Sequence, residues 1–265
     1  MKGRYGLCYI ERVKNMTNKE IIKHIDDGAN YYVSLFGEAV HMEKFDKEFY
    51  SYVKPKEGEQ GISFIYNLRI NDLPAEQMET VVDEMKSMNM PIWFGMDLSD
   101  EAIYAFWGKK PTHENRAPKE DDEVYLAMLS EEKPEYQKND HKIIKVHTAE
   151  EFAAWAQMVN NILAGGHTDI HPVNHFVWCE KMGVKCYILY HNGVPVSVTA
   201  IIDNNGVDSL EFVGTVPEMR RKGFAKAICE RAVSDAFADG ASIITIRAIN
   251  RSAARLYQSI GFKVY

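Results

Sequence analysis

The spacing of hydrophobic and polar residues along the chain predicts an alternation of helices and strands. Apolar positions and flanking polar residues predict helices at 17–36, 73–89, 99–108, 149–163 and 173–182. Two of these helices are preceded by Thr, with Glu three residues later, a capping-box pattern that satisfies free N–H groups at a helix start. Short apolar or alternating runs predict strands at 61–69, 90–98, 124–129 and 142–146. This order of elements is typical of an α/β protein.

The strongest strand signals lie in the last third of the chain. Two β-rich runs, 184–191 and 194–202, flank the dipeptide Asn192-Gly193, which favours a type I′ turn. A hairpin is therefore expected here. A second turn at 204–206 leads into a further strand at 208–216.

The composition is that of a globular protein with room for two domains. The chain has 265 residues, of which 46% are hydrophobic and 11% aromatic. The charged, proline-containing stretch 109–122 and the polar stretch 130–140 lack apolar periodicity. We therefore expect an N-terminal α/β domain over residues 1–135 and a second domain over residues 136–265.

Charge and cysteine content exclude several classes of function. The formal net charge is −7, which disfavours a nucleic-acid partner because phosphates are neutralised by clustered Lys and Arg. Four cysteines without a CxxC pair predict reduced thiols rather than a disulfide framework. No run approaches the ~20 apolar residues that cross a bilayer. We expect a soluble, cytoplasmic protein with no membrane partner.

The segment after the strand at 208–216 carries the clearest chemical signal. A short basic turn containing Gly223 leads into an amphipathic helix, and a helix start offers free N–H groups and a positive dipole end. Gly223 allows a ligand to approach the backbone closely. A diphosphate fits such a site, although a helix start can also be basic without binding anything.

Two motifs in this region resemble signatures of the GNAT superfamily of acyl-CoA N-acyltransferases. The cofactor signature R/Q-x-x-G-x-G/A stands here as residues 220–225, RRKGFA. The second signature, N-x-x-A-x-x-L-Y-x-x-x-G-F, is matched at each fixed position over residues 250–262. The resemblance implies a mixed, mostly antiparallel sheet flanked by helices for the C-terminal domain, and acetyl-CoA as co-substrate.

The resemblance also implies which residues bind the coenzyme. In this family the strand before the signature bulges and splays from its neighbour, so that its backbone can pair with pantetheine, while the turn amides hold the diphosphate. The implied cofactor-binding residues are Val213, Gly214, Thr215, Arg220, Arg221, Lys222, Gly223, Phe224, Ala225, Lys226 and Asn250.

The family reaction is direct attack of an amine on the thioester, and it implies roles for two further groups. Tyr257 stands where the family places the acid that protonates the leaving thiolate, and the N–H of Val213 would hold the oxyanion. Glu211 lies two residues before Val213, on the same strand face if side chains alternate, and is our candidate base. The alternatives are a core tyrosine and a glutamate paired with a nearby cation. Cys229 falls inside a helix, which disfavours a nucleophilic role.

The sequence leaves several questions open. His167, His171 and His175 are four residues apart, but Pro172 interrupts the segment and no metal site is expected. The N-terminal domain, which lacks the cofactor signature, is either a degenerate GNAT-like half or an unrelated cap. Besides an acetyltransferase acting on a small-molecule or peptide amine, the chain could be a non-catalytic acyl-CoA sensor or a tandem-GNAT aminoacyl transferase. The acceptor and the oligomeric state cannot be read from the sequence.

Overall fold

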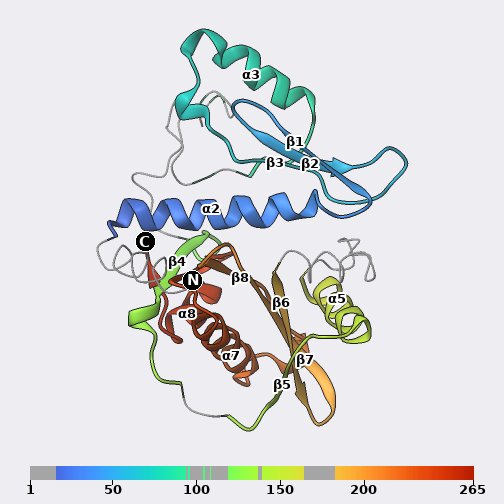
Figure 1. Ribbon diagram of the computed structural model, residues 1–265, viewed down its shortest axis with the longest axis vertical. Coiled ribbons are helices and arrows are strands. Elements are labelled where there is room, and N and C mark those ends of the chain that lie inside the picture. Colours follow the sequence, from blue (N-terminus) through green and yellow to red (C-terminus); the bar gives the residue numbers. More distant parts are fainter. Residues whose placement is uncertain are drawn as a thin grey trace, which may run out of the picture. The chain divides into compact units, whose positions relative to one another are not determined.

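A computed structural model describes residues 16–93, 95, 104, 108, 119–136, 139–163 and 183–265 (Figure 1). The chain forms two compact units. The larger unit takes in the chain up to Ala29 and from Glu120 onward, and the smaller unit spans Asn30–Lys119. Among the described residues, no helix combines the length and the apolar character needed to span a membrane.

The larger unit is built on a seven-stranded sheet with the order β10-β4-β9-β8-β7-β6-β5. Its strands are β4 (Val124–Leu129), β5 (Lys142–Lys145), β6 (Val184–His191), β7 (Val194–Ile202), β8 (Val207–Thr215), β9 (Ile243–Ala248) and β10 (Lys263–Val264). Only β8 and β9 pair in parallel among these described strands; the other neighbours are antiparallel. The expected mixed, mostly antiparallel sheet is confirmed.

Helices flank this sheet (Figure 1). They are α5 (Ala149–Leu163), α7 (Phe224–Ala238), α8 (Arg251–Gln258) and the first part of α2 (Asn18–Phe36), with short 3-10 turns at Ser130–Glu132 and Pro217–Met219. The main core lies between the sheet and the pair α7 and α8, where Leu210, Ile228 and Ile244 are fully buried. On the other face, Ile21 and Ile25 of α2 pack against strand residues such as Ile243.

Local sequence signals account for many of these boundaries. The Thr17 N–H donates to Glu20 Oε2 at 2.7 Å and the Glu20 N–H donates back to Thr17 Oγ1 at 3.3 Å, which is the expected capping box. Thr148 and Glu151 form the second box at the start of α5. The hairpin turn has positive φ angles of 52° at Asn192 and 79° at Gly193, as a type I′ turn requires.

Strand β4 is where the structure departs most from the expected domain boundary. It was expected at residues 124–129 but within the N-terminal domain, whereas it pairs with β9 along its full length and with β10 at Lys263–Val264. It therefore lies between two C-terminal strands, β10 and β9, within their sheet. The apolar sequence of a buried strand predicts that strand but carries no information about its partner.

The smaller unit contains a three-stranded antiparallel sheet and one long helix. The strands are β1 (Met42–Asp46), β2 (Ser51–Pro55) and β3 (Phe64–Tyr66), in that order, and α3 spans Ala75–Ser87 after a 3-10 turn at Ile70–Asp72. Strands β1 and β2 were not predicted from the sequence. Of the expected strand at 90–98, the described part makes one bridge, between Ile92 and Ile65. Most of the helix expected at 99–108 lies outside the described residues.

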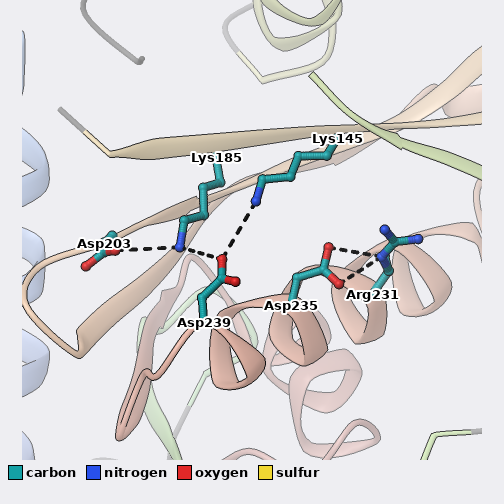
Figure 2. Close-up of polar contacts among 6 residues, drawn as sticks. All are labelled: Lys145, Lys185, Asp203, Arg231, Asp235 and Asp239. Atoms are coloured by element: carbon teal, nitrogen blue, oxygen red, sulfur yellow. Dashed lines mark hydrogen bonds and ion pairs between the residues drawn. The ribbon is translucent and has the colours of Figure 1, made fainter. Parts of the chain in front are cut away.

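A charged cluster joins the end of α7 to the sheet of the larger unit (Figure 2). Lys185 on β6 lies 2.9 Å from Asp239 and 3.5 Å from Asp203, and Lys145 on β5 lies 3.7 Å from Asp239. Asp208 on β8 is 2% exposed, and its Oδ1 makes no hydrogen bond with the described residues. Burial, with Asp203 nearby, raises the pKa of Asp208 to about 7 despite the opposing charge of Lys185.

This raised pKa predicts that the cluster costs stability at neutral and alkaline pH. Because folded Asp208 holds its proton up to about pH 7 and the unfolded carboxyl only to about 3.8, stability falls as pH rises between these values. We expect Asp208→Asn to stabilise the protein by roughly 2 kcal/mol at pH 8 and by little at pH 4. Urea unfolding at both pH values measures this. Asp27→Asn, which loses only an i,i+4 ion pair with Lys23 on α2, is the control, and an equal effect of Asp208→Asn at both pH values would contradict the assignment.

Candidate active site

The two central strands of the larger sheet part at their carboxyl ends. β8 pairs with β9 at Val207–Ser209 and at no later residue, although both strands are fully described and continue to Thr215 and Ala248. The resulting opening separates strand edges that would otherwise hydrogen-bond to each other. An extended ligand can pair with such an edge as an additional strand would.

A β-bulge in β8 lies beside this opening. The register with β7 shifts so that Ala200 pairs with Glu211 but Val198 pairs with Gly214, and Phe212 has a positive φ of 55°. Such a conformation costs a non-glycine residue on the order of 1–3 kcal/mol and persists only when neighbours enforce it. Trp155 of α5 is one such neighbour, because its ring packs edge-on to Phe212 at 5.2 Å.

Further contacts hold the bulge in place. The Trp155 indole N–H donates to the Thr199 carbonyl at 3.0 Å, and the Thr199 hydroxyl donates to the Glu211 carbonyl at 3.0 Å. At Gly214, an added Cβ would lie 2.9 Å from Ile162, so α5 packs directly on this strand. Neither Trp155 nor Thr199 was predicted as a site residue, because no local pattern marks a residue whose role is to support a bulge.

The bulge overturns the expectation that Glu211 and Val213 share a strand face. With the extra residue, Glu211 and Gly214 face the same side, whereas Val213 packs against the core cluster that α7 and α8 cover. Strict alternation applies only to an unbroken strand, and a bulge reverses the facing of every later residue. Glu211 and the backbone of Val213 still lie at the same opening.

The turn after β8 presents a row of unused backbone donors. Arg221 and Gly223 have positive φ angles of 64° and 87°, and α7 begins at Phe224. None of the six N–H groups from Arg221 to Lys226 donates a hydrogen bond within the described structure, whereas the next N–H, of Ala227, donates to the Gly223 carbonyl at 3.0 Å. A Cβ added at Gly223 would meet no atom within 4 Å, so the space in front of the turn is open.

Arg220 anchors this turn to the bulged strand. Its Nε donates to the Thr215 carbonyl, the last residue of β8, at 3.1 Å. The positive charge therefore sits between the strand end and the helix start. Unused amides, a helix dipole and a nearby cation are together able to hold an anion.

Glu211 and Tyr257, the two candidate acid–base groups, both have raised pKa values, and Glu211 acts on Tyr257 electrostatically. Burial raises the pKa of Glu211 to about 7, while the Ser209 hydroxyl and the Arg247 charge lower it. Burial also raises the pKa of Tyr257 well above 10, helped by Cys229 and Glu211, so the phenol stays protonated at neutral pH. Tyr257 is 6% exposed and its hydroxyl makes no hydrogen bond with a described residue.

Asn250 and Cys229 have evident structural roles. The Asn250 side chain accepts a hydrogen bond from the Ala253 N–H at 2.8 Å and so caps α8. Cys229 is fully buried in α7, and burial raises the pKa of its thiol, which leaves it poorly suited as a nucleophile. His167, His171 and His175 lie outside the described residues.

Comparison with known proteins agrees with this geometry. The profile of the Acetyltransferase (GNAT) family matches residues 152–262. This segment is a GNAT domain. It contains the bulged strand, the open turn and both signature helices. No curated protein matches the chain.

Solved structures extend the likeness beyond the GNAT domain to most of the chain. A GCN5-related N-acetyltransferase from Kribbella flavida is similar with a TM-score of 0.58 and 18% identity, over 91% of each chain. A GCN5-related N-acetyltransferase from Sphaerobacter thermophilus is similar with a TM-score of 0.55 and 13% identity, over 83% of this chain and 79% of that one. At such identities the likeness shows the fold.

Proposed function

We propose that the GNAT domain transfers an acetyl group from acetyl-CoA to a primary amine of a small molecule or peptide. The observation that carries this proposal is the set of unused amides from Arg221 to Lys226, next to a strand whose edge is open. The first N–H groups of a helix have no partner within the helix, and together with the positive end of the helix dipole they favour a bound anion. A diphosphate joined to an extended amide-containing arm suits both features.

Each part of the coenzyme then has a matching part of the protein. The diphosphate would accept hydrogen bonds from the turn amides, with Arg220 and Lys222 adding positive charge. The pantetheine arm would pair with β8 at Val213–Thr215, beside the Asn250 cap. This leaves the thioester at the bulge, near Glu211 and Tyr257, where the pKa values of both groups are raised.

The chemistry follows from two groups in opposite protonation states. Glu211, ionised in part near pH 7, would accept a proton from the acceptor ammonium, so that the amine lone pair can attack the thioester carbon. The Val213 N–H would donate to the oxyanion of the tetrahedral intermediate. When the C–S bond breaks, Tyr257 would donate its proton to the departing thiolate. The products are an amide and free CoA.

The proposal is tested by CoA binding combined with a thiol-release assay. Calorimetry with acetyl-CoA measures binding, and release of free thiol is then followed over a panel of primary amines, including diamines and short peptides. Acetyl-CoA binding with amine-dependent thiol release supports the transferase. Binding without turnover on the whole panel would instead favour an acyl-CoA sensor, and failure to bind CoA would overturn the proposal.

Tyr257→Phe tests the acid. We expect turnover to fall by about tenfold, at the weak end for acid catalysis because a thiolate leaves readily, with acetyl-CoA affinity unchanged. Stability should also be unchanged, since the hydroxyl makes no hydrogen bond with the described residues. Tyr136→Phe is a matched control: it loses a 2.8 Å hydrogen bond to the Ile260 carbonyl but should keep turnover. Wild-type turnover in Tyr257→Phe would remove Tyr257 from the mechanism.

A further inference from the structure

The strand register places Glu211 and Arg247 on opposite sides of the opening and on the same face of the sheet. The parallel pairing of β8 with β9 ends at Ser209 and Thr245. Both side chains lie on the face that α2 covers, because a Cβ added at Gly28 would be 2.9 Å from Thr245 Oγ1 and 3.7 Å from Ser209 Cβ. Two residues further along each strand, Glu211 and Arg247 point to that same face.

On the side away from the opening, the Arg247 side chain contacts residues of and next to strand β4. It is the cross-strand partner of Tyr125, and its guanidinium lies 5.2 Å from the Tyr125 ring centroid and 3.4 Å from the Tyr125 hydroxyl. Its Nη2 also donates to Glu123 at 2.8 Å. The Arg247 side chain is 12% exposed but that of Glu123 is 47% exposed, so a mostly buried cation is paired with a carboxylate at the surface.

A surface carboxylate neutralises a buried guanidinium only in part, because water screens the exposed partner. The charge of Arg247 acts on Glu211, where it opposes the effect of burial. Other polar groups around the two side chains within the described residues include Ser209 on β8, Tyr257 on α8, and the carboxylate of Asp26 on α2, which acts on Tyr125. Among the described residues, Arg247 is the cation whose charge acts on Glu211.

We propose that Arg247 is a positioning residue for Glu211: its guanidinium holds the Glu211 carboxylate in the charged form, and Glu123 competes with Glu211 for that guanidinium. The role as a positioning residue rests on the proposed function, in which Glu211 is the base. The electrostatic coupling itself does not depend on that function. Arg247 and Glu123 together therefore set the pH above which the base is active.

The coupling is measured directly by carboxyl ¹³C NMR on protein labelled with [5-¹³C]glutamate. The Glu211 signal is assigned as the one that disappears in Glu211→Gln. We expect Arg247→Gln to raise its titration midpoint by about 1 pH unit and Glu123→Gln to lower it, because removing a competing carboxylate strengthens the effect of Arg247. Tyr125→Phe, which keeps every charge, is the control and should leave the midpoint in place.

The acidic limb of kcat/KM against pH, measured with acetyl-CoA and an amine that the panel finds active, should move in the same two directions. Opposite shifts are the decisive result, since a merely structural role would not give shifts of opposite sign. If Arg247→Gln does not fold, the surface variant Glu123→Gln carries the test, by a downward shift that the Tyr125→Phe control lacks. Equal shifts in one direction, or no shift in either variant, would overturn the proposal. Opposite NMR shifts without turnover on any amine would leave the coupling intact and refute only the transferase function.

Discussion

Gly223→Asp is expected to lower the affinity for acetyl-CoA by at least about 100-fold, because one changed side chain removes several contacts to the diphosphate at once. An added Cβ at this position meets no protein atom within 4 Å, so the new carboxylate would extend into the open space before the turn. There it would put a negative charge where the phosphates bind, and it could accept hydrogen bonds from the same amides. Titration calorimetry with acetyl-CoA measures the loss.

The variant should nevertheless fold. Gly223 is the N-cap of α7, a position where Asp is favoured because its side chain satisfies free N–H groups. This gain offsets part of the strain at a φ of 87°. Gly193→Asp is the matched control, since Gly193 also has a positive φ of 79° and open space, but lies in the hairpin turn between β6 and β7. Wild-type CoA affinity in Gly223→Asp would place the diphosphate elsewhere.

Glu211→Gln is expected to lower kcat by roughly 10²–10⁴-fold, the usual contribution of a general base, while acetyl-CoA still binds. The wild-type rate should fall about tenfold for each pH unit below 7, because the carboxylate with a pKa of about 7 must lose its proton before it can act. The variant should lose this acidic limb. Stopped-time thiol-release assays between pH 5 and 8 measure both effects.

Asp208→Asn is the control that distinguishes a role of Glu211 as the base from a general effect of removing a buried carboxylate. Asp208 lies on the same strand, and its pKa is also raised to about 7, but the charges that act on it are those of Asp203, Lys185 and Asp239 near the end of α7. We expect this variant to keep the acidic limb and to change stability only. If Glu211→Gln retained activity within about threefold of wild type, far less than a base supplies, Glu211 would not be the base.

The elements that local signals specify are predicted correctly from the sequence. Two capping boxes, one Asn-Gly turn and the apolar strand runs depend on residues close together in the chain, and their geometry matches the expectation. The basic glycine turn at 220–225 and the signature at 250–262 likewise predict helix starts from neighbouring residues, and α7 and α8 begin there. The amphipathic helices and most strands of the larger unit follow from the same cause.

The pairing of strands that are far apart in the chain could be seen only in the tertiary structure. Nothing local in β4 shows that it inserts between β9 and β10, and nothing near Glu211 shows that Phe212 bulges against Trp155. Because of this bulge, the side chain of Val213 lies on the opposite face of the sheet from Glu211. The simple alternation of side chains along a strand had predicted the same face for both.

The sequence by itself specified the glycine turn at the start of α7 and the order of the C-terminal elements, because each depends on residues close together in the chain, and it named Glu211 and Tyr257 as candidates. Only the tertiary structure decided where β8 parts from β9 and which charges face Glu211. Arg247 and Glu123 are 124 residues apart, and their 2.8 Å contact exists because β4 and β9 pair. Packing between distant segments, which no local pattern encodes, sets the electrostatics of this site.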